Sequence, residues 1–155
     1  MREHGVGTVH LITGEFPPQF GGVSDYTSAV ARGLAAGGQR VHVWCPAADG
    51  DVSPVPPSVI IHRTAGDWRG SDLTRLDREL DDVEGPRRIL VQWVPHAYGR
   101  RSMNVGFCAW VRRRALKGDA VELMVHEACL AFGEGGWKQD AAALVHRLML
   151  ALLRS

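Results

Sequence analysis

Cysteine is scarce in this sequence, and its distribution excludes the structural roles that cysteines most often serve. Only three cysteines occur among the 155 residues, Cys45, Cys108 and Cys129, and no C-x-x-C motif is present. An odd number at such wide spacing favours neither a disulfide framework nor a zinc site. We therefore expect buried, reduced thiols in a cytoplasmic protein, and we assign no metal ligands.

Charge imbalance and long apolar runs are also lacking. The 18 lysines and arginines nearly equal the 17 aspartates and glutamates, which leaves a formal net charge of +1. This balance argues against a nucleic-acid binder that works by bulk electrostatics. The N-terminus has no apolar signal core, and no segment reaches the roughly 18 apolar residues that a membrane span requires. Contact with the inner face of a membrane stays open.

Three common nucleotide-binding or catalytic signatures are absent as well. G-x-G-x-x-G, the P-loop sequence and G-x-S-x-G do not occur. An oxidoreductase of the ordinary dinucleotide-binding type would also carry an acidic residue after its second strand, where Cys45 and Pro46 stand here. Both observations count against that class of enzyme.

The sequence does contain a regular alternation of apolar strands and amphipathic helices. Its length suits one domain with a substantial core. The predicted strands cover residues 6–13, 40–46, 59–62, 89–94 and 121–126, and the predicted helices cover residues 23–36, 71–83, 104–116 and 139–154. We predict a doubly wound, Rossmann-like α/β domain whose parallel sheet has about five strands in the order 3-2-1-4-5, with helices on both faces.

Two charged segments and one histidine are interpreted structurally. The charged side chains of the helix at residues 71–83 are expected to be solvated. The basic cluster at residues 112–114 suits the negative end of a helix, and we prefer this interpretation to contact with anionic lipid. His10 is expected to be a strand residue near an edge or end of the sheet rather than a ligand.

The predicted topology gathers polar residues at one edge of the sheet. In the order 3-2-1-4-5, the switch point lies between the first and fourth strands, at their carboxyl ends. The loops expected there cover residues 15–23, 95–99 and 126–137. Ligands of open α/β sheets bind in this crevice, so this edge is the candidate site.

Paired glycines, Gly21 and Gly22, stand immediately before the first predicted helix. The first N–H groups of a helix have no intrahelical partner and carry partial positive charge, which favours anions. Glycine also lets a ligand approach the backbone closely. An ordinary strand-to-helix turn, capped by Ser24 or Asp25, explains the local pattern equally well.

Three segments resemble the family-4 retaining glycosyltransferases of the GT-B fold. Residues 15–23 read EFPPQFGGV, which is similar to the E-x-x-P and G-G-[VI] of that family's first loop. Residues 92–99 read QWVPHAYG, similar to a strand that ends in Q-[YW]-x-P, and Asn104 then opens the next helix. His126 and Glu127 resemble the family's strand-terminal H-[DE]. The matches span nearly the whole chain in the right order.

The resemblance implies an enzyme that transfers a sugar from a nucleotide-diphosphate donor to an acceptor with retention of configuration. Residues 1–155 would form the N-terminal, acceptor-side domain, and the C-terminal GT-B domain would be its partner. The acceptor would be a glycan, a lipid-linked molecule or a small molecule. No cofactor and no metal are implied, and we expect the isolated chain to be inactive.

The resemblance also assigns roles to individual residues. Gly21, Gly22 and Val23 would bind the donor phosphates, and His126 would be the catalytic residue beside the transferred sugar. The acceptor side would be lined by Glu15, Asp25, Tyr26, His96 and Tyr98. From spacing alone, the strand-terminal histidines would more simply satisfy backbone groups.

The last predicted helix suggests an alternative to catalysis. Its apolar residues go most of the way round, and such a helix needs cover on more than one side. The chain could therefore be a non-catalytic or degenerate binding and assembly module that docks on a partner through this helix.

Overall fold

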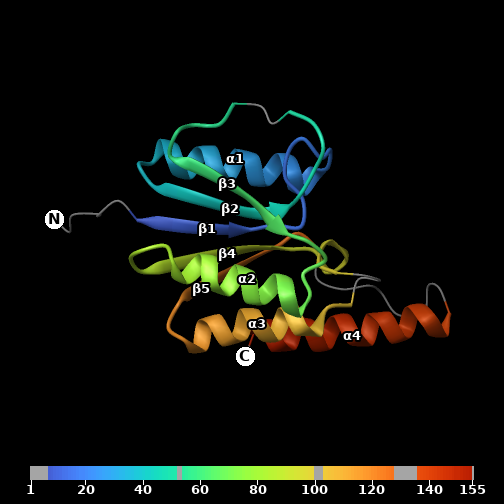
Figure 1. The fold of residues 1–155 in the computed structure, drawn as a ribbon. Helices are drawn as coiled ribbons and strands as arrows, with labels where there is room; N and C mark the ends of the chain where they lie inside the picture. The colour runs from blue at the N-terminus through green and yellow to red at the C-terminus, as the bar shows by residue number, and fades with distance from the viewer. Residues whose placement is uncertain (1–6, 52–53, 100–102, 128–135, 155) are drawn as a thin grey trace.

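The computed structural model describes residues 7–51, 54–99, 103–127 and 136–154, and it alternates strands and helices as predicted (Figure 1). The strands are β1 (Thr8–Ile12), β2 (Arg40–Pro46), β3 (Val59–Ala65), β4 (Arg87–Trp93) and β5 (Ala120–Val125). The helices are α1 (Gly22–Ala36), α2 (Gly70–Asp81), α3 (Val105–Leu116) and α4 (Trp137–Arg154), with a 3-10 turn, η1, at Pro95–Ala97. Most of the predicted loop at residues 126–137 lies outside the described residues.

The five strands form one parallel sheet in the order β3-β2-β1-β4-β5, which confirms the predicted topology. Leu11 in the central strand pairs with Val43 on one side and Leu90 on the other. Figure 1 shows α1 on one face of the sheet and α2, α3 and α4 on the other. The carboxyl ends of β1 and β4 therefore adjoin where the chain turns to opposite faces.

Alternating side chains of the strands build a separate core on each face. Val9, Leu11 and Val41 pack with Phe16 and Ala31 on the α1 face. On the other face, Ile12, Trp44, Ile89, Val91 and Trp93 pack against the three remaining helices. A strand that is buried on both faces reads as a nearly continuous apolar run, which is why the strands were predictable.

The two described cysteines are buried and free, as expected. Burial raises the pKa of the Cys45 thiol to about 11 and that of Cys108 to about 12, so both stay protonated and unreactive near neutral pH. Cys129 lies outside the described residues. Over the described part of the chain, no helix combines the length and hydropathy needed to cross a bilayer.

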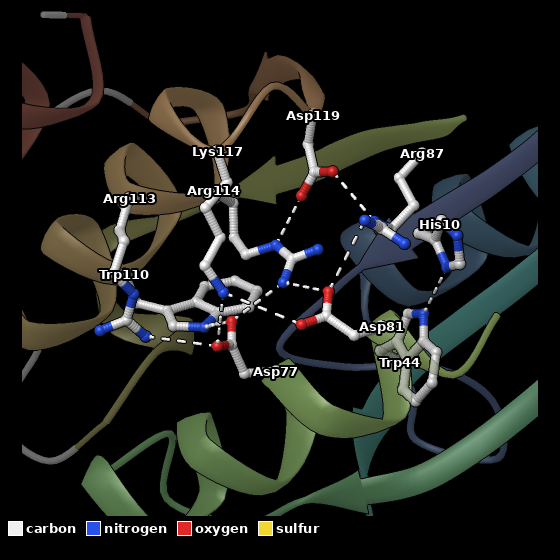
Figure 2. Close-up of polar contacts among 10 residues, drawn as sticks. All are labelled: His10, Trp44, Asp77, Asp81, Arg87, Trp110, Arg113, Arg114, Lys117 and Asp119. Carbon is white, nitrogen blue, oxygen red and sulfur yellow. Dashed lines mark hydrogen bonds and ion pairs between the residues drawn. The ribbon is translucent and has the colours of Figure 1, made fainter. Parts of the chain in front are cut away.

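The charged segments differ from the sequence interpretation, because one arginine of the basic cluster is buried (Figure 2). The Arg114 side chain is 1% exposed and donates to Asp77 at 3.1 Å and to Asp81 at 2.7 Å, both on α2. It also donates to Asp119, just before β5, at 2.5 Å. The acidic face of α2 and the basic end of α3 therefore form ion pairs around the buried Arg114, while Arg113, Lys117 and Asp81 stay about half exposed.

Asp77 is the most heavily bonded carboxylate of this network. Burial alone would raise its pKa, but hydrogen bonds from Lys117, Arg114 and Trp110 lower it below the ordinary value. Arg87 at the start of β4 adds an ion pair to Asp119 at 3.0 Å. The network thus joins α2 and α3 to the amino ends of β4 and β5, opposite the candidate site.

His10 also differs from its expected place, because it lies in the central strand and is fully buried. Its Nδ1 accepts a hydrogen bond from Trp44 Nε1 at 3.2 Å, and its ring lies 5.3 Å from that of His42. His42 in turn lies 2.9 Å from His62, nitrogen to nitrogen, and Trp44 stacks on His62 at 3.8 Å. His10, His42 and Trp44 are therefore buried together on the face of the sheet that carries α2, and the partly buried His62 adjoins them.

Candidate functional site

The candidate site lies at the carboxyl edge of the sheet, where the loop after β1 meets the turn after β4. A β-carbon added to Gly14 would lie 2.4 Å from the Ala97 β-carbon, so the two segments are in direct contact. Only glycine fits at this approach. The predicted switch point is therefore a closely packed junction of two loops.

Hydrogen bonds within the loop after β1 hold it in one shape. The Thr13 hydroxyl donates to the Glu15 carbonyl at 2.8 Å. The Gln19 backbone N–H donates to the Phe16 carbonyl at 3.2 Å, and the Gln19 carbonyl accepts from the Ser24 hydroxyl at 2.6 Å. This loop therefore delivers the start of α1 in a fixed position.

Glu15 caps α1 from outside the helix. Its Oε1 accepts the Ser24 N–H at 3.1 Å, and a β-carbon at Gly21 would lie 2.5 Å from the same oxygen. The predicted capping by Ser24 or Asp25 is wrong, since Gly21 is the N-cap residue and no side chain of its own caps the helix. Glu15 thus uses one of the N–H groups that an anion could have taken, and it explains why residue 21 is glycine.

The N–H groups of Gly22 and Val23 precede the first intrahelical bond of α1, which runs from the Asp25 N–H to the Gly21 carbonyl at 3.0 Å. Such groups have no partner inside the helix. Gly22 is exposed, and a β-carbon there would meet nothing within 4 Å. The space beside Gly22 is therefore open, and the Glu15 carboxylate stands at the same helix start.

His126 follows β5 and is held from three directions. Its backbone N–H donates to the Trp93 carbonyl at 3.1 Å, and its Nε2 lies 2.7 Å from Gln92 Oε1. The Tyr26 ring meets the imidazole edge-on, with 4.9 Å between centroids, and the Tyr26 hydroxyl reaches the Met124 sulfur at 3.7 Å. The structure therefore brings Tyr26 and His126 into contact.

Gln92 is a site residue that sequence reasoning did not assign. It is the one polar side chain in the apolar run at residues 89–94, and it is 0% exposed. A buried amide on a central strand needs a partner. That isolated polar position was the signal that could have identified it.

The remaining predicted residues lie around this centre. His96 Nδ1 is 3.3 Å from Glu127 Oε2, and both side chains are exposed. Asp25 borders a hollow of about 340 Å³ that is lined by the loop after β1, including Phe20, and not by Tyr26 or His126. Asp25 and Tyr26 therefore face different surroundings although they are neighbours in the chain.

Tyr98 does not line any surface, which corrects its expected place on the acceptor side. It is 0% exposed and its ring stacks on Phe107 at 4.1 Å between centroids. Its hydroxyl bridges the carbonyls of Ile12 at 3.0 Å and Gln92 at 2.7 Å, and burial raises its pKa. Tyr98 thus ties the ends of β1 and β4 together from inside.

No protein-family model, curated protein or solved structure matches this chain significantly. Among the described residues, no group of three or more histidine, cysteine, aspartate or glutamate side chains is placed to hold a metal ion. The arrangement offers two N–H groups without an intrahelical partner at a helix start, and an imidazole in contact with Tyr26 of the same helix. N–H groups of this kind favour anions, and an imidazole can hydrogen-bond a hydroxyl group.

Proposed function

We propose that the chain is the acceptor-side domain of a retaining glycosyltransferase that uses a nucleotide-diphosphate sugar. The contact between Tyr26 and His126 carries the proposal. Tyr26 is four residues after Gly22 on α1, so the helix start lies just over one turn, about 6 Å, along the helix from the residue that touches the imidazole. A diphosphate at the helix start would leave its sugar near His126.

Each group then has a chemical role. The Gly22 and Val23 N–H groups and the helix dipole would stabilise the charge of the departing diphosphate. His126 would hydrogen-bond the transferred sugar, while Glu15 holds the helix start in place. A second GT-B domain would supply the nucleotide-binding half, the acceptor would approach from the rim at His96, and we propose that the protein works in the cytoplasm.

A Gly22→Val substitution should abolish phosphate binding and leave the fold intact. The new side chain would cover the open N–H groups, but its β-carbon meets no atom within 4 Å. Binding is measured by amide chemical shifts during titration with inorganic pyrophosphate and with UDP-, GDP- and ADP-sugars. We expect shifts at residues 21–23 and at His126, and a loss of affinity of at least about tenfold in the variant.

The matched control is Gly33→Val in the same helix, where an added β-carbon also meets nothing within 4 Å. It should bind pyrophosphate like the unaltered chain. Shifts that are absent with every probe, or that are equal in Gly22→Val and the unaltered chain, would overturn the proposed phosphate site.

A second candidate, the non-catalytic assembly module, is favoured by one surface of α4. Trp137, Leu144 and Leu148 are 77%, 64% and 52% exposed. Together with the exposed Ala141 and Ala151 they follow the alternating spacing of four and three residues typical of a helix–helix seam. A second copy of this chain carries the same seam, so the two would cover each other helix against helix.

Self-association would distinguish this candidate. We expect a weak dimer whose mass, measured by sedimentation equilibrium, rises with concentration and returns to that of a monomer in Leu144→Lys. Leu116→Lys on α3 is the control, because Leu116 is 72% exposed but lies outside the seam. A monomeric mass at all concentrations would exclude the second copy as the partner of this surface.

A further inference from the structure

Gln92 and His126 form a side-chain pair whose geometry defines the state of the imidazole. Gln92 is the second-last residue of β4, and His126 follows the last residue of β5. In the sheet, Gln92 pairs in register with Met124. The distance from Gln92 Oε1 to His126 Nε2 is 2.7 Å, a short hydrogen bond. Gln92 is fully buried, whereas His126 is exposed.

The direction of this hydrogen bond follows from the atoms. An amide oxygen can only accept, so His126 Nε2 must carry the hydrogen. A neutral imidazole has one hydrogen, and Nδ1 is then the nitrogen with a free lone pair. The position of the imidazole ring is also restrained by the hydrogen bond from the His126 N–H to the Trp93 carbonyl and by the edge-on contact with Tyr26.

We propose that Gln92 is a positioning residue that fixes His126 in the Nε2–H tautomer, so that Nδ1 is the acceptor presented to a ligand. Only the use of Nδ1 toward a sugar hydroxyl rests on the proposed glycosyltransferase function. The tautomer itself is a property of this chain without any substrate. In the transfer reaction, Nδ1 would accept a hydrogen bond from a hydroxyl group of the donor sugar or of the acceptor.

Gln92 is itself fixed from the backbone. Its carbonyl lies 2.7 Å from the buried Tyr98 hydroxyl, which also reaches the end of β1. The strand position from which the side chain leaves is therefore tied to its neighbours through its main chain, and the bond to His126 orients the amide, whose Nε2 is buried without a hydrogen-bond partner among the described residues. This support explains how the buried Gln92 can fix the tautomer of the exposed His126.

The test is the nitrogen spectrum of the histidine rings in the unaltered chain and in Gln92→Met. In the unaltered chain at slightly alkaline pH, we expect His126 Nε2 to show the chemical shift of a protonated nitrogen and Nδ1 that of an unprotonated one. The Nε2 hydrogen should also exchange slowly enough to be observed. In Gln92→Met, that hydrogen should exchange too fast to be seen, and both nitrogens should shift toward values of a tautomer mixture.

Two further variants make the result specific. Met124→Leu, which removes the sulfur beside Tyr26 but leaves Gln92, should keep the unaltered spectrum. Gln92→Glu keeps an acceptor at the same place, so it should retain the Nε2–H signal. If Gln92→Met does not fold, Gln92→Asn carries the test, because its shorter side chain withdraws the oxygen from His126 and should lose the slowly exchanging Nε2 hydrogen.

Finding the hydrogen on Nδ1 in the unaltered chain would overturn the proposal, and so would an unchanged spectrum in folded Gln92→Met. Neither result depends on phosphate binding. A fixed Nε2–H tautomer in a chain that binds no pyrophosphate would support the role of Gln92 and contradict the proposed function, so the two failures are distinguishable.

Discussion

Arg114→Met should lower the free energy of unfolding by about 3 kcal/mol, because removing one partner of a buried ion pair leaves uncompensated charge behind. The side chain is 1% exposed and its guanidinium contacts three carboxylates. Asp119, itself 5% exposed, would keep only its bond to Arg87. Methionine matches the length of the arginine stem but returns none of the hydrogen bonds.

The neighbouring residue provides the control for this prediction. Arg113 is 56% exposed and, among the carboxylates of the described residues, approaches Asp77 alone, at 3.9 Å. Arg113→Met should therefore change stability by no more than about 0.5 kcal/mol, as is usual for surface positions. Urea unfolding of both variants decides the matter. Equal losses would show that charge number, and not burial, sets the contribution of this cluster.

The sheet could be predicted from the sequence, but the ion-pair network around Arg114 could not, because only the sheet produces a local sequence pattern. Val41 and Val43 belong to an unbroken apolar run, which a strand buried on both faces requires. Arg114 stands in a row of three arginines, and sequence does not distinguish the one that turns inward. The partner carboxylates lie on another helix, so their approach depends on packing that no local pattern encodes.

In the candidate site, too, some residues could be recognised from the local sequence and others could not. The paired glycines and the strand-terminal His126 were recognisable because a helix start and a strand end have local signatures. The use of Glu15 as the cap was not recognisable, because it acts nine residues ahead of Ser24 through the folded shape of the loop. Tyr98 was misplaced for a similar reason, since nothing in a loop sequence says that a tyrosine turns back into the core.

The buried histidines should make the protein lose stability as the pH falls below neutral. Burial lowers the pKa of His10 and of His42 to about 4, with a further contribution from neighbouring positive charge, and burial also lowers the pKa of His62. The unfolded chain takes up protons near pH 6.5, the ordinary histidine value, while the folded chain stays neutral. Stability is therefore complete above that pH and is lost between pH 6.5 and about 4.

The slope in that window should approach about 1.4 kcal/mol per pH unit for each buried histidine, because the unfolded state then binds one more proton per ring. Urea unfolding measured at intervals between about pH 7 and pH 4.5 gives the slope, and the window lies above most carboxylate titrations. In His10→Gln, the amide oxygen can still accept the hydrogen bond from Trp44, and the slope should fall by the contribution of one histidine, about 1.4 kcal/mol per pH unit. A stability that is equal at both ends of the window would mean that the histidine core takes up protons without cost, which burial among Trp44, Arg87 and two other imidazoles argues against.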